Sequence, residues 1–313
     1  MEDTSLLVLV VAILQAAVRA GTPILFVCIG EIYAERSGVL NVGLEGLMLV
    51  GAIAGFTVGF RLDNPVAGVA AAAVAGALFA SIHAFVTITL RADQIVSGLT
   101  LTILGTGISG FFGKAMIGQV GVGFERFAVP GLEKIPILGQ ALFRQDGLVY
   151  FSYLIVPIAW WVLYKTHLGL AIRSVGEDPG TADSLGVSVT RIRYGCVLFG
   201  GAMAGLGGAY LSLAYTTMWI EQMSGGRGWI TLALVIFAAW NPAKAVLGAY
   251  LFGGADALQL RIQAVGLGIP TYFLMMLPYL LTITILVLAS RASLRRRIGA
   301  PAALGLPYAR EER

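Results

Sequence analysis

Five polar side chains interrupt segments of the chain that are otherwise apolar. Asp256, Gln259 and Gln263 follow the spacing i, i+3 and i+7, so on a helix they would form one polar stripe. Asn41 and Glu45 lie four residues apart in another apolar region. Carboxylates and amides hydrogen-bond hydroxyl and amino groups, so these side chains could line a route for a small polar solute. The alternative is that they form hydrogen bonds between helices.

The acidic residues in these segments need a physical reason to be there. An ionisable side chain at membrane depth costs about 2.5–3.5 kcal/mol on insertion scales, and it therefore tends to face the protein interior or a water-filled path. Glu31 and Glu35 are one helical turn apart, an arrangement that repels unless Arg36 or a neighbour compensates. These positions are therefore expected to face away from lipid.

A second candidate site is the polar stretch 165–193 between two long apolar segments. Asp178 can cap a helix, Pro179 suits the first helical position, and Gly186 can end the helix about two turns later. A short capped helix would give a partner protein a rigid docking surface. The alternative is an ordinary loop that happens to contain such residues.

Motifs for catalysis, nucleotides or metals are not found. GTGISG at 105–110 has the letters of a dinucleotide fingerprint, but it lies in an apolar segment with no strand–helix unit. A Walker A motif is missing, so the chain is not expected to bind ATP. His83 and His167 have no partner at metal or triad spacing. The sequence predicts no catalytic residue, metal or cofactor.

Composition indicates an all-α polytopic membrane protein. Hydrophobic residues make up 58% of the chain and charged residues 12%, whereas a soluble domain has roughly a quarter charged. The net charge of +4 comes largely from RASLRRR near the C-terminus, which is better suited to anchoring at the cytoplasmic membrane surface than to binding nucleic acid. Cys28 and Cys196 suggest neither a disulfide framework nor a thiolate metal site.

Apolar segments of the length that a bilayer requires predict about nine spans, with eight to ten possible. The first is interrupted at Arg19, Gly21 and Pro23, so it could be a broken helix or two shorter elements. The segment 229–240 is too short to cross alone, which predicts a broken or re-entrant element. The predicted spans are 6–32, 42–60, 66–90, 95–113, 148–165, 193–215, 229–240, 244–262 and 270–290.

The placement of Lys and Arg predicts the orientation. If the 165–193 loop and the C-terminus share a side with Arg36, Arg91 and Lys244, that side carries 13 of the 21 basic residues, which assigns it to the cytoplasm. The loops 118–147 and 219–228 would then lie outside, where they could meet a partner. The side of the N-terminus stays open. We expect one membrane domain, residues 1–295, which includes the 165–193 loop, followed by a basic cytoplasmic tail, residues 296–313.

Small residues predict close helix packing. Gly201 and Gly205 form a GxxxG face inside GGAMAGLGGA. A loose echo between LNVGLEGLMLVGAIAG (40–55) and VLFGGAMAGLGGAYLS (197–212) is what an internally duplicated transporter would show.

Two blocks of sequence carry a resemblance to a known family. GEIYAERSGVLNVGLEGLMLVGAIAGF (30–56) resembles the first block of permease subunits in the branched-chain amino acid, ribose and nucleoside group of ATP-binding cassette importers, and AERSGVLNVGLEG is most similar to the nucleoside and simple-sugar branch. RSVGEDPGTADSLGVSVTRIRYGCVLFGGAMAGLGGAYL (173–211) resembles the cytoplasmic loop of that family and the span after it. Asp178, Thr181-Ala182 and Val187 depart from the usual Asn, Ala pair and Ile, and they leave helix capping possible.

The resemblance implies a multi-pass permease of the bacterial inner membrane, with a cytoplasmic coupling helix that seats in a separate ATPase subunit. The implied partners are that ATPase, a second permease (a related chain or another copy), an extracytoplasmic solute-binding protein, membrane lipid, and a small polar solute such as a nucleoside or ribose; no nucleic acid is implied. The permease itself would not be an enzyme. The implied ATPase-coupling residues are Glu177, Asp178, Pro179, Ala182, Leu185 and Gly186.

The main alternative is a secondary transporter driven by an ion gradient. Such a transporter would use Glu45 or Asp256 at a coupling-ion site near the bilayer midplane, and it would not need a capped cytoplasmic helix. A membrane-embedded enzyme is disfavoured because no cluster of His, Asp, Glu or Cys has catalytic spacing.

Overall fold

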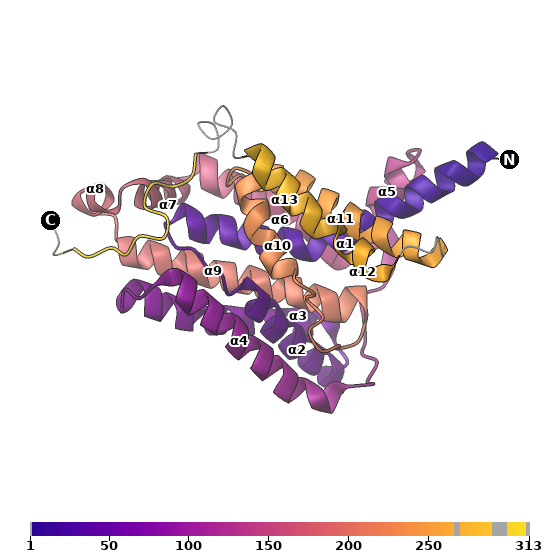
Figure 1. Ribbon diagram of the computed structural model, residues 1–313, viewed down its shortest axis with the longest axis horizontal. Helices are drawn as coiled ribbons and strands as arrows, with labels where there is room; N and C mark the ends of the chain where they lie inside the picture. The colour runs from indigo at the N-terminus through magenta and orange to yellow at the C-terminus, as the bar shows by residue number, and fades with distance from the viewer. Residues whose placement is uncertain (1, 266–269, 290–298, 311–313) are drawn as a thin grey trace.

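The computed structural model describes residues 2–265, 270–289 and 299–310 as an elongated bundle, with most of its helices running along the long axis (Figure 1). Two short strands, β1 (Arg126–Ala128) and β2 (Arg144–Asp146), pair antiparallel. The α-helices are α1 (Glu2–Arg36), α2 (Leu44–Leu62), α3 (Pro65–Ala84), α4 (Gln94–Gly113), α5 (Leu138–Phe143), α6 (Gly147–Lys165), α7 (His167–Glu177), α8 (Pro179–Ser184), α9 (Val189–Tyr210), α10 (Arg227–Phe237), α11 (Pro242–Val265), α12 (Thr271–Met275) and α13 (Leu277–Ala289). Short π or 3₁₀ turns are η1 (Phe85–Thr89), η2 (Lys114–Met116), η3 (Leu132–Lys134) and η4 (Leu211–Tyr215).

The lengths and the apolar composition of the helices are those of a membrane protein. Among the described residues, six helices are long and apolar enough to cross a membrane: Leu9–Arg36, Leu44–Leu62, Pro65–Thr89, Gln94–Met116, Gly147–Lys165 and Val189–Tyr215. The shorter apolar helices Arg227–Phe237 and Tyr272–Thr284 add to the bundle. The predicted class, a helical polytopic membrane protein, is therefore confirmed. Six helices in the described part of the chain have the length and composition of a span, so the predicted count of about nine is not confirmed.

The two ends of the bundle differ. One end, which we call the α8 end, carries α7, α8 and residues 299–310, and the other, the α5 end, carries α5 and the start of α1 (Figure 1). The predicted outer loops meet near the α5 end, because a β-bridge joins Val120 to Met218 and the Gly121 N–H donates to the Thr217 carbonyl at 3.0 Å. RASLRRR lies outside the described residues.

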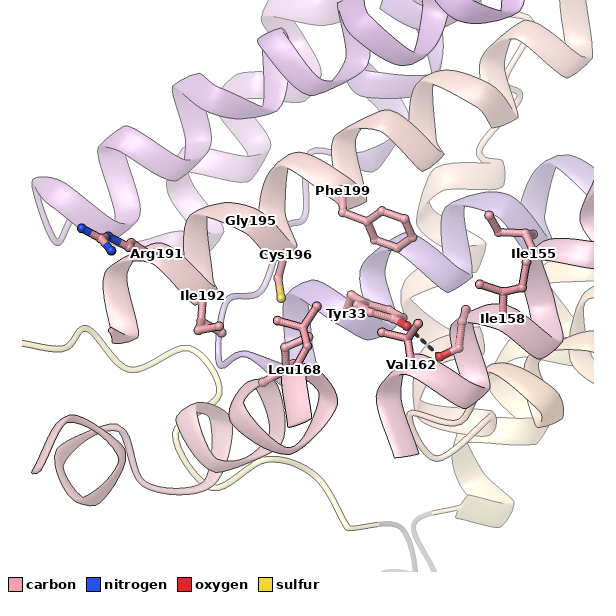
Figure 2. A pocket seen from close by; sticks show the side chains of 12 residues that line it. Tyr33, Ile155, Ile158, Val162, Leu168, Arg191, Ile192, Gly195, Cys196 and Phe199 are labelled. Atoms are coloured by element: carbon pink, nitrogen blue, oxygen red, sulfur yellow. Dashed lines mark hydrogen bonds between the residues drawn. The ribbon is translucent and has the colours of Figure 1, made fainter. Parts of the chain in front are cut away.

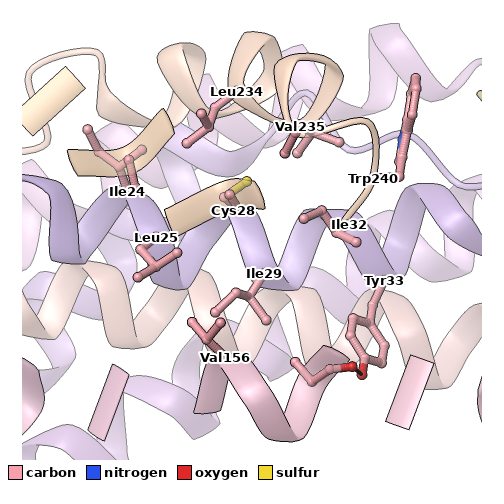
Figure 3. Packing of buried hydrophobic residues seen from close by; sticks show 14 of the residues in the cluster. Ile24, Leu25, Cys28, Ile29, Ile32, Tyr33, Val156, Leu234, Val235 and Trp240 are labelled. Atoms are coloured by element: carbon pink, nitrogen blue, oxygen red, sulfur yellow. Dashed lines mark hydrogen bonds between the residues drawn. The ribbon is translucent and has the colours of Figure 1, made fainter. Parts of the chain in front are cut away.

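The first apolar segment is one continuous helix, α1, although the sequence left a break at Pro23 open. A proline removes one backbone donor, and a helix buried among other helices tolerates this loss in a membrane. Helix α1 packs against α9 on one side and α11 on another. Its buried side chains reach Leu234 and Val235 of α10 on one side and Val156 of α6 on the other (Figure 3). Helix α1 is thus the central support of the bundle.

Glycines bring α9 close to α2 and α3, as the GxxxG pattern predicts. A Cβ on Gly205 would overlap the Ala72 carbonyl of α3, and a Cβ on Gly201 would overlap Ala80. Gly51 of α2 meets the Gly205 backbone directly. These contacts leave no room for side chains, so glycine sets the distance between the three helices.

Polar caps start several of the helices. Asn64 accepts hydrogen bonds from the Val66 and Ala67 N–H groups, and Pro65 occupies the first helical position of α3. The buried Asp146 carboxylate does the same for Leu148 and Val149 at the start of α6. Because these caps satisfy N–H groups that lack partners within the helix, they fix where the spans begin.

Two membrane segments are interrupted in a similar way. Helix α1 runs from the α5 end to the α8 end, the chain then turns back through residues 37–43, and α2 starts inside the bundle (Figure 1). Helix α9 runs in the opposite sense, residues 216–226 turn back into the bundle, and α10 starts there. The second half of the segment 219–228, which was predicted as an outer loop, is not free to meet a partner. Its residues Ser224 and Gly228 are buried against Glu45.

The matching pairs are therefore α1 with α9 and α2 with α10. The sequence echo instead aligned residues 40–55, at the start of α2, with residues 197–212 of α9. We call residues 37–43 and 216–226 the two breaks. The stretch 40–55 lies at and after the first break, whereas 197–212 lies before the second break, and the two stretches pack on each other.

We predict that Gly205→Ala destabilises the protein by about 1–3 kcal/mol, because the added methyl group meets the Ala72 backbone and the helices must separate. The measurement is the thermal unfolding midpoint of the purified protein in detergent. Gly195→Ala is the matched control, since it lies on the same helix and its Cβ would meet nothing within 4 Å. Equal midpoints for the two variants would contradict the assigned packing.

Candidate translocation and coupling sites

The two interrupted segments meet at the Glu45 side chain. One carboxylate oxygen of Glu45 accepts hydrogen bonds from the Ser224 hydroxyl at 2.5 Å and the Gly226 N–H at 2.8 Å. The other accepts from the Gly228 N–H at 2.7 Å. Helix α10 begins at Arg227, so a carboxylate from the start of α2 satisfies free N–H groups at the N-terminus of α10, where negative charge is favoured. Glu45 therefore joins the two breaks.

Side chains from other helices satisfy the extended backbone of residues 37–43. The Asn41 N–H donates to Glu31 of α1 at 2.9 Å, and the Leu40 N–H donates to Gln94 of α4 at 2.7 Å. His83 of α3 contacts the Leu40 carbonyl through Nε2 at 3.1 Å. Non-helical backbone at membrane depth needs such partners because no water is available there.

Asn41 belongs to this support. Its side-chain oxygen accepts from the Gly43 N–H at 2.9 Å, and the residue is buried. Asn41 and Glu45 thus bond to backbone groups and to the Ser224 hydroxyl at the breaks, which is the helix-packing alternative weighed from the sequence. Both nevertheless lie where the two segments meet.

A small polar cavity lies beside the same meeting point. Arg227 of α10 and Asp256 of α11 form an ion pair at 2.7 Å, with 16% and 24% of their side chains exposed. The cavity next to them measures about 130 Å³, and Gln259 and Tyr279 also line it. Apolar residues line it as well, Ile24 and Phe252 among them. A cavity of this size that has both polar and apolar lining can admit a hydroxyl-bearing part of a small solute.

The three residues of the predicted stripe on α11 have different surroundings. Asp256 and Gln259 line the cavity, whereas Gln263 is partly exposed about one turn farther along the helix and is not among the lining residues. Arg227, which lies between Gly226 and Gly228 at the start of α10, was not among the residues predicted from the sequence. The signal was available, because Arg227 is a cation at the start of the short apolar segment.

The capped helix in the 165–193 stretch forms as predicted. Asp178 caps α8 by accepting hydrogen bonds from the Thr181 hydroxyl at 2.6 Å and the Thr181 N–H at 3.0 Å, and Pro179 is the first helical residue. These hydrogen bonds hold the pKa of Asp178 below its ordinary value, so the cap stays charged at neutral pH. Gly186 ends the turn with φ +86°, in the left-handed region that favours glycine.

Fewer apolar residues at α8 are exposed than the sequence suggested. Ala182 is buried against Val175 and Val189 of the same chain, whereas Leu185 is 80% exposed. Glu177 accepts a hydrogen bond from the Ala302 N–H at 3.4 Å. Leu185 is therefore the apolar coupling candidate available to a partner, and Ala182 holds α8 on the bundle.

Residues 299–310 connect α7 and α8 to the first break. The Ala303 N–H donates to the Gly176 carbonyl at 2.9 Å, and the Gly305 N–H donates to the Gly38 carbonyl at 3.2 Å. Buried Arg193 donates to the Ser37 carbonyl at 3.1 Å and to the Leu306 carbonyl at 3.1 Å. This part of the predicted basic tail is thus packed into the α8 end.

Comparison with known proteins gives a consistent result. Residues 13–286 match the family described as branched-chain amino acid transport system, permease component. A putative glucose ABC transporter permease protein, TsgC13, of Haloferax volcanii is 41% identical over 96% of this chain and 98% of its own length. The nucleoside ABC transporter permease protein NupC of Lactococcus lactis is 40% identical over 85% and 88%, and the guanosine ABC transporter permease protein NupQ of Bacillus subtilis is 36% identical over 96% and 97%. No solved structure matches the chain.

We predict that Glu45→Ala lowers the yield and thermal stability of the folded protein. It removes the acceptor of the buried Ser224 hydroxyl and Gly228 N–H and of the partly buried Gly226 N–H, and each buried donor left without a partner costs about 1–3 kcal/mol. Glu45→Gln keeps one carbonyl oxygen and should be intermediate. The measurement is the monodisperse fraction and unfolding midpoint in detergent.

Glu221→Gln is the matched control for this series, because Glu221 is exposed in the same 216–226 segment. An unfolding midpoint of Glu45→Ala equal to that of Glu221→Gln would show that the carboxylate does not hold the breaks together.

Proposed function

Because this chain belongs to the branched-chain amino acid transport system permease family, we propose that it is the membrane subunit of an ATP-driven importer that carries nucleosides. The observation that carries the proposal is the meeting of two interrupted membrane segments at Glu45, beside the cavity of Arg227 and Asp256. Interrupted helices near a polar cavity are how transporters expose backbone and side-chain groups to a solute.

The proposed solute follows from the named relatives. NupC and NupQ are named for nucleosides and guanosine, and both align with most of this chain. Glucose is the second candidate, because TsgC13 is named for glucose. A nucleoside and glucose share a ring with neighbouring hydroxyl groups, which a carboxylate, a guanidinium and an amide can bind. Asp256 and Gln259 are therefore the proposed solute contacts of this chain, with Gln263 farther along the same helix.

The proposed ATPase contact is α8. Its cap and its packing through Ala182 make it rigid, and Leu185 projects from it. A rigid helix transmits motion of a partner better than a loop that bends, so α8 suits the role of coupling helix. On this assignment the α8 end, including residues 299–310, is cytoplasmic and the start of α1 is outside.

The complex that we propose contains more than this chain. A separate ATPase would hydrolyse ATP, a second permease, either a related chain or another copy, would complete the route, and an external binding protein would deliver solute at the α5 end. The paired loops around Val120 and Met218 offer the binding protein a contact there.

We predict that proteoliposomes with the whole complex take up guanosine when ATP and loaded binding protein are supplied, and that Asp256→Asn lowers uptake at least tenfold because the carboxylate contact and the ion pair with Arg227 are lost. Radiolabelled guanosine and glucose are compared in parallel. Asp63→Asn, in the turn after α2, is the control. Uptake by this chain alone, driven by a sodium or proton gradient, would replace the proposal with the secondary transporter.

A second expectation concerns α8. Leu185→Glu should weaken copurification of the ATPase or separate ATP hydrolysis from uptake, because the new charge would be buried without a partner in the docking groove. Leu62→Glu is the control, since Leu62 is 63% exposed at the other end of the bundle. Normal assembly, hydrolysis and uptake with Leu185→Glu would remove α8 from the coupling interface.

A further inference from the structure

A large apolar cavity lies away from the proposed solute route. It measures about 340 Å³ and opens between α6, α7 and α9, with Tyr33 of α1 at its base (Figure 2). Ile155, Ile158, Val162, Ile172 and Phe199 supply most of its wall. The Tyr33 hydroxyl donates to the Ala159 carbonyl at 2.6 Å, so this polar group already has a partner. The cavity therefore offers a ligand a hydrocarbon surface and little hydrogen bonding.

Aromatic and basic residues next to the cavity mark its depth in the membrane. At the α8 end of α6, the Lys165 ammonium lies 5.9 Å from the Trp160 ring, and the Arg173 guanidinium lies 5.4 Å from the Tyr164 ring. Trp161 beside them is 57% exposed. Tryptophan and tyrosine with Lys and Arg gather where a bilayer meets water. Ile155 and Ile158 precede this belt on the same helix, and Val162 lies within it, so the cavity extends from the belt toward the hydrocarbon.

The end of the cavity nearest the α8 end carries positive charge. Figure 2 shows Ile192, Cys196 and Phe199 along α9, with Arg191 at the outer end of the row. Arg191 is exposed, and no acidic side chain is among the described residues that line the cavity. A guanidinium at this end of the cavity can bind a phosphate, whereas the apolar wall excludes one.

We propose that this cavity binds one anionic phospholipid, with an acyl chain between α6 and α9 and the phosphate at Arg191. An apolar cavity of this kind does not hold ordered water, because water needs two to four polar partners. A nucleoside or sugar would leave its hydroxyl groups unpaired there. An acyl chain needs no such partners, and it is the hydrocarbon that surrounds α6. The site is independent of the transported solute.

Gly195 gives a way to fill the cavity without disturbing the packing of α9. It lines the cavity, and a Cβ built on it would meet nothing within 4 Å. Gly195→Leu should therefore place its side chain where the acyl chain would lie. Gly107→Leu is the matched control, because Gly107 on α4 is equally open but lies outside the cavity.

The test is lipid extraction and quantitative mass spectrometry of protein purified from a membrane that contains phosphatidylglycerol, cardiolipin and phosphatidylethanolamine. Wild type and Gly107→Leu should retain an anionic phospholipid, and Gly195→Leu should retain at least fivefold less while eluting as a folded protein of the same size. Arg191→Gln should keep a phospholipid but lose the preference for anionic headgroups. Arg61→Gln, a cation outside the cavity, should keep that preference.

Three results would overturn the proposal. The first is wild-type protein with no retained phospholipid, and the second is unchanged retention by Gly195→Leu. The third is a change of oligomeric state in Gly195→Leu, which would assign the cavity to a second protein chain.

Discussion

Backbone that leaves a helix inside a bilayer must find its hydrogen-bond partners within the protein, and this constraint explains the polar residues of the chain. Glu31, Gln94 and His83 come from three helices and hold the segment between α1 and α2. Glu45 holds the start of α10. Glu31 and Glu45, whose carboxylates look costly in an apolar sequence, are thus partners of the backbone where the two segments are interrupted.

The same hydrogen bonds connect the two candidate sites. Residues 299–310 link α7 to Gly38, and Arg193 links the start of α9 to Ser37. The segment that begins at Ser37 ends at α2, whose Glu45 holds α10 beside the cavity of Arg227. On the proposed assignment of α8 as the coupling helix, a displacement of α8 would reach the cavity through this chain of contacts.

The sequence predicted local structure better than it predicted which residues are buried and which helices are continuous. The cap at Asp178 and the close packing at Gly205 depend on neighbouring residues and on residue size, and both formed as expected. The continuity of α1 and the burial of Ser224 depend on which helices surround them, and hydropathy carries no information on that. Ala182 shows the same limit, because spacing placed it beside Leu185 on α8 while contacts with Val175 and Val189 turned it inward.

The burial of polar residues also separates structural from functional candidates. Both carboxylate oxygens of Glu45 and the side-chain oxygen of Asn41 already accept hydrogen bonds from groups of the breaks, so a solute could engage these oxygens only by displacing those bonds. Arg227 and Asp256 bind mainly each other, remain partly exposed, and border a cavity. An ion pair of this kind can open to accept hydroxyl groups without unfolding the breaks. Of the polar residues in the apolar segments, this pair is therefore best suited to meet the solute, while Glu45 fixes where the pair stands.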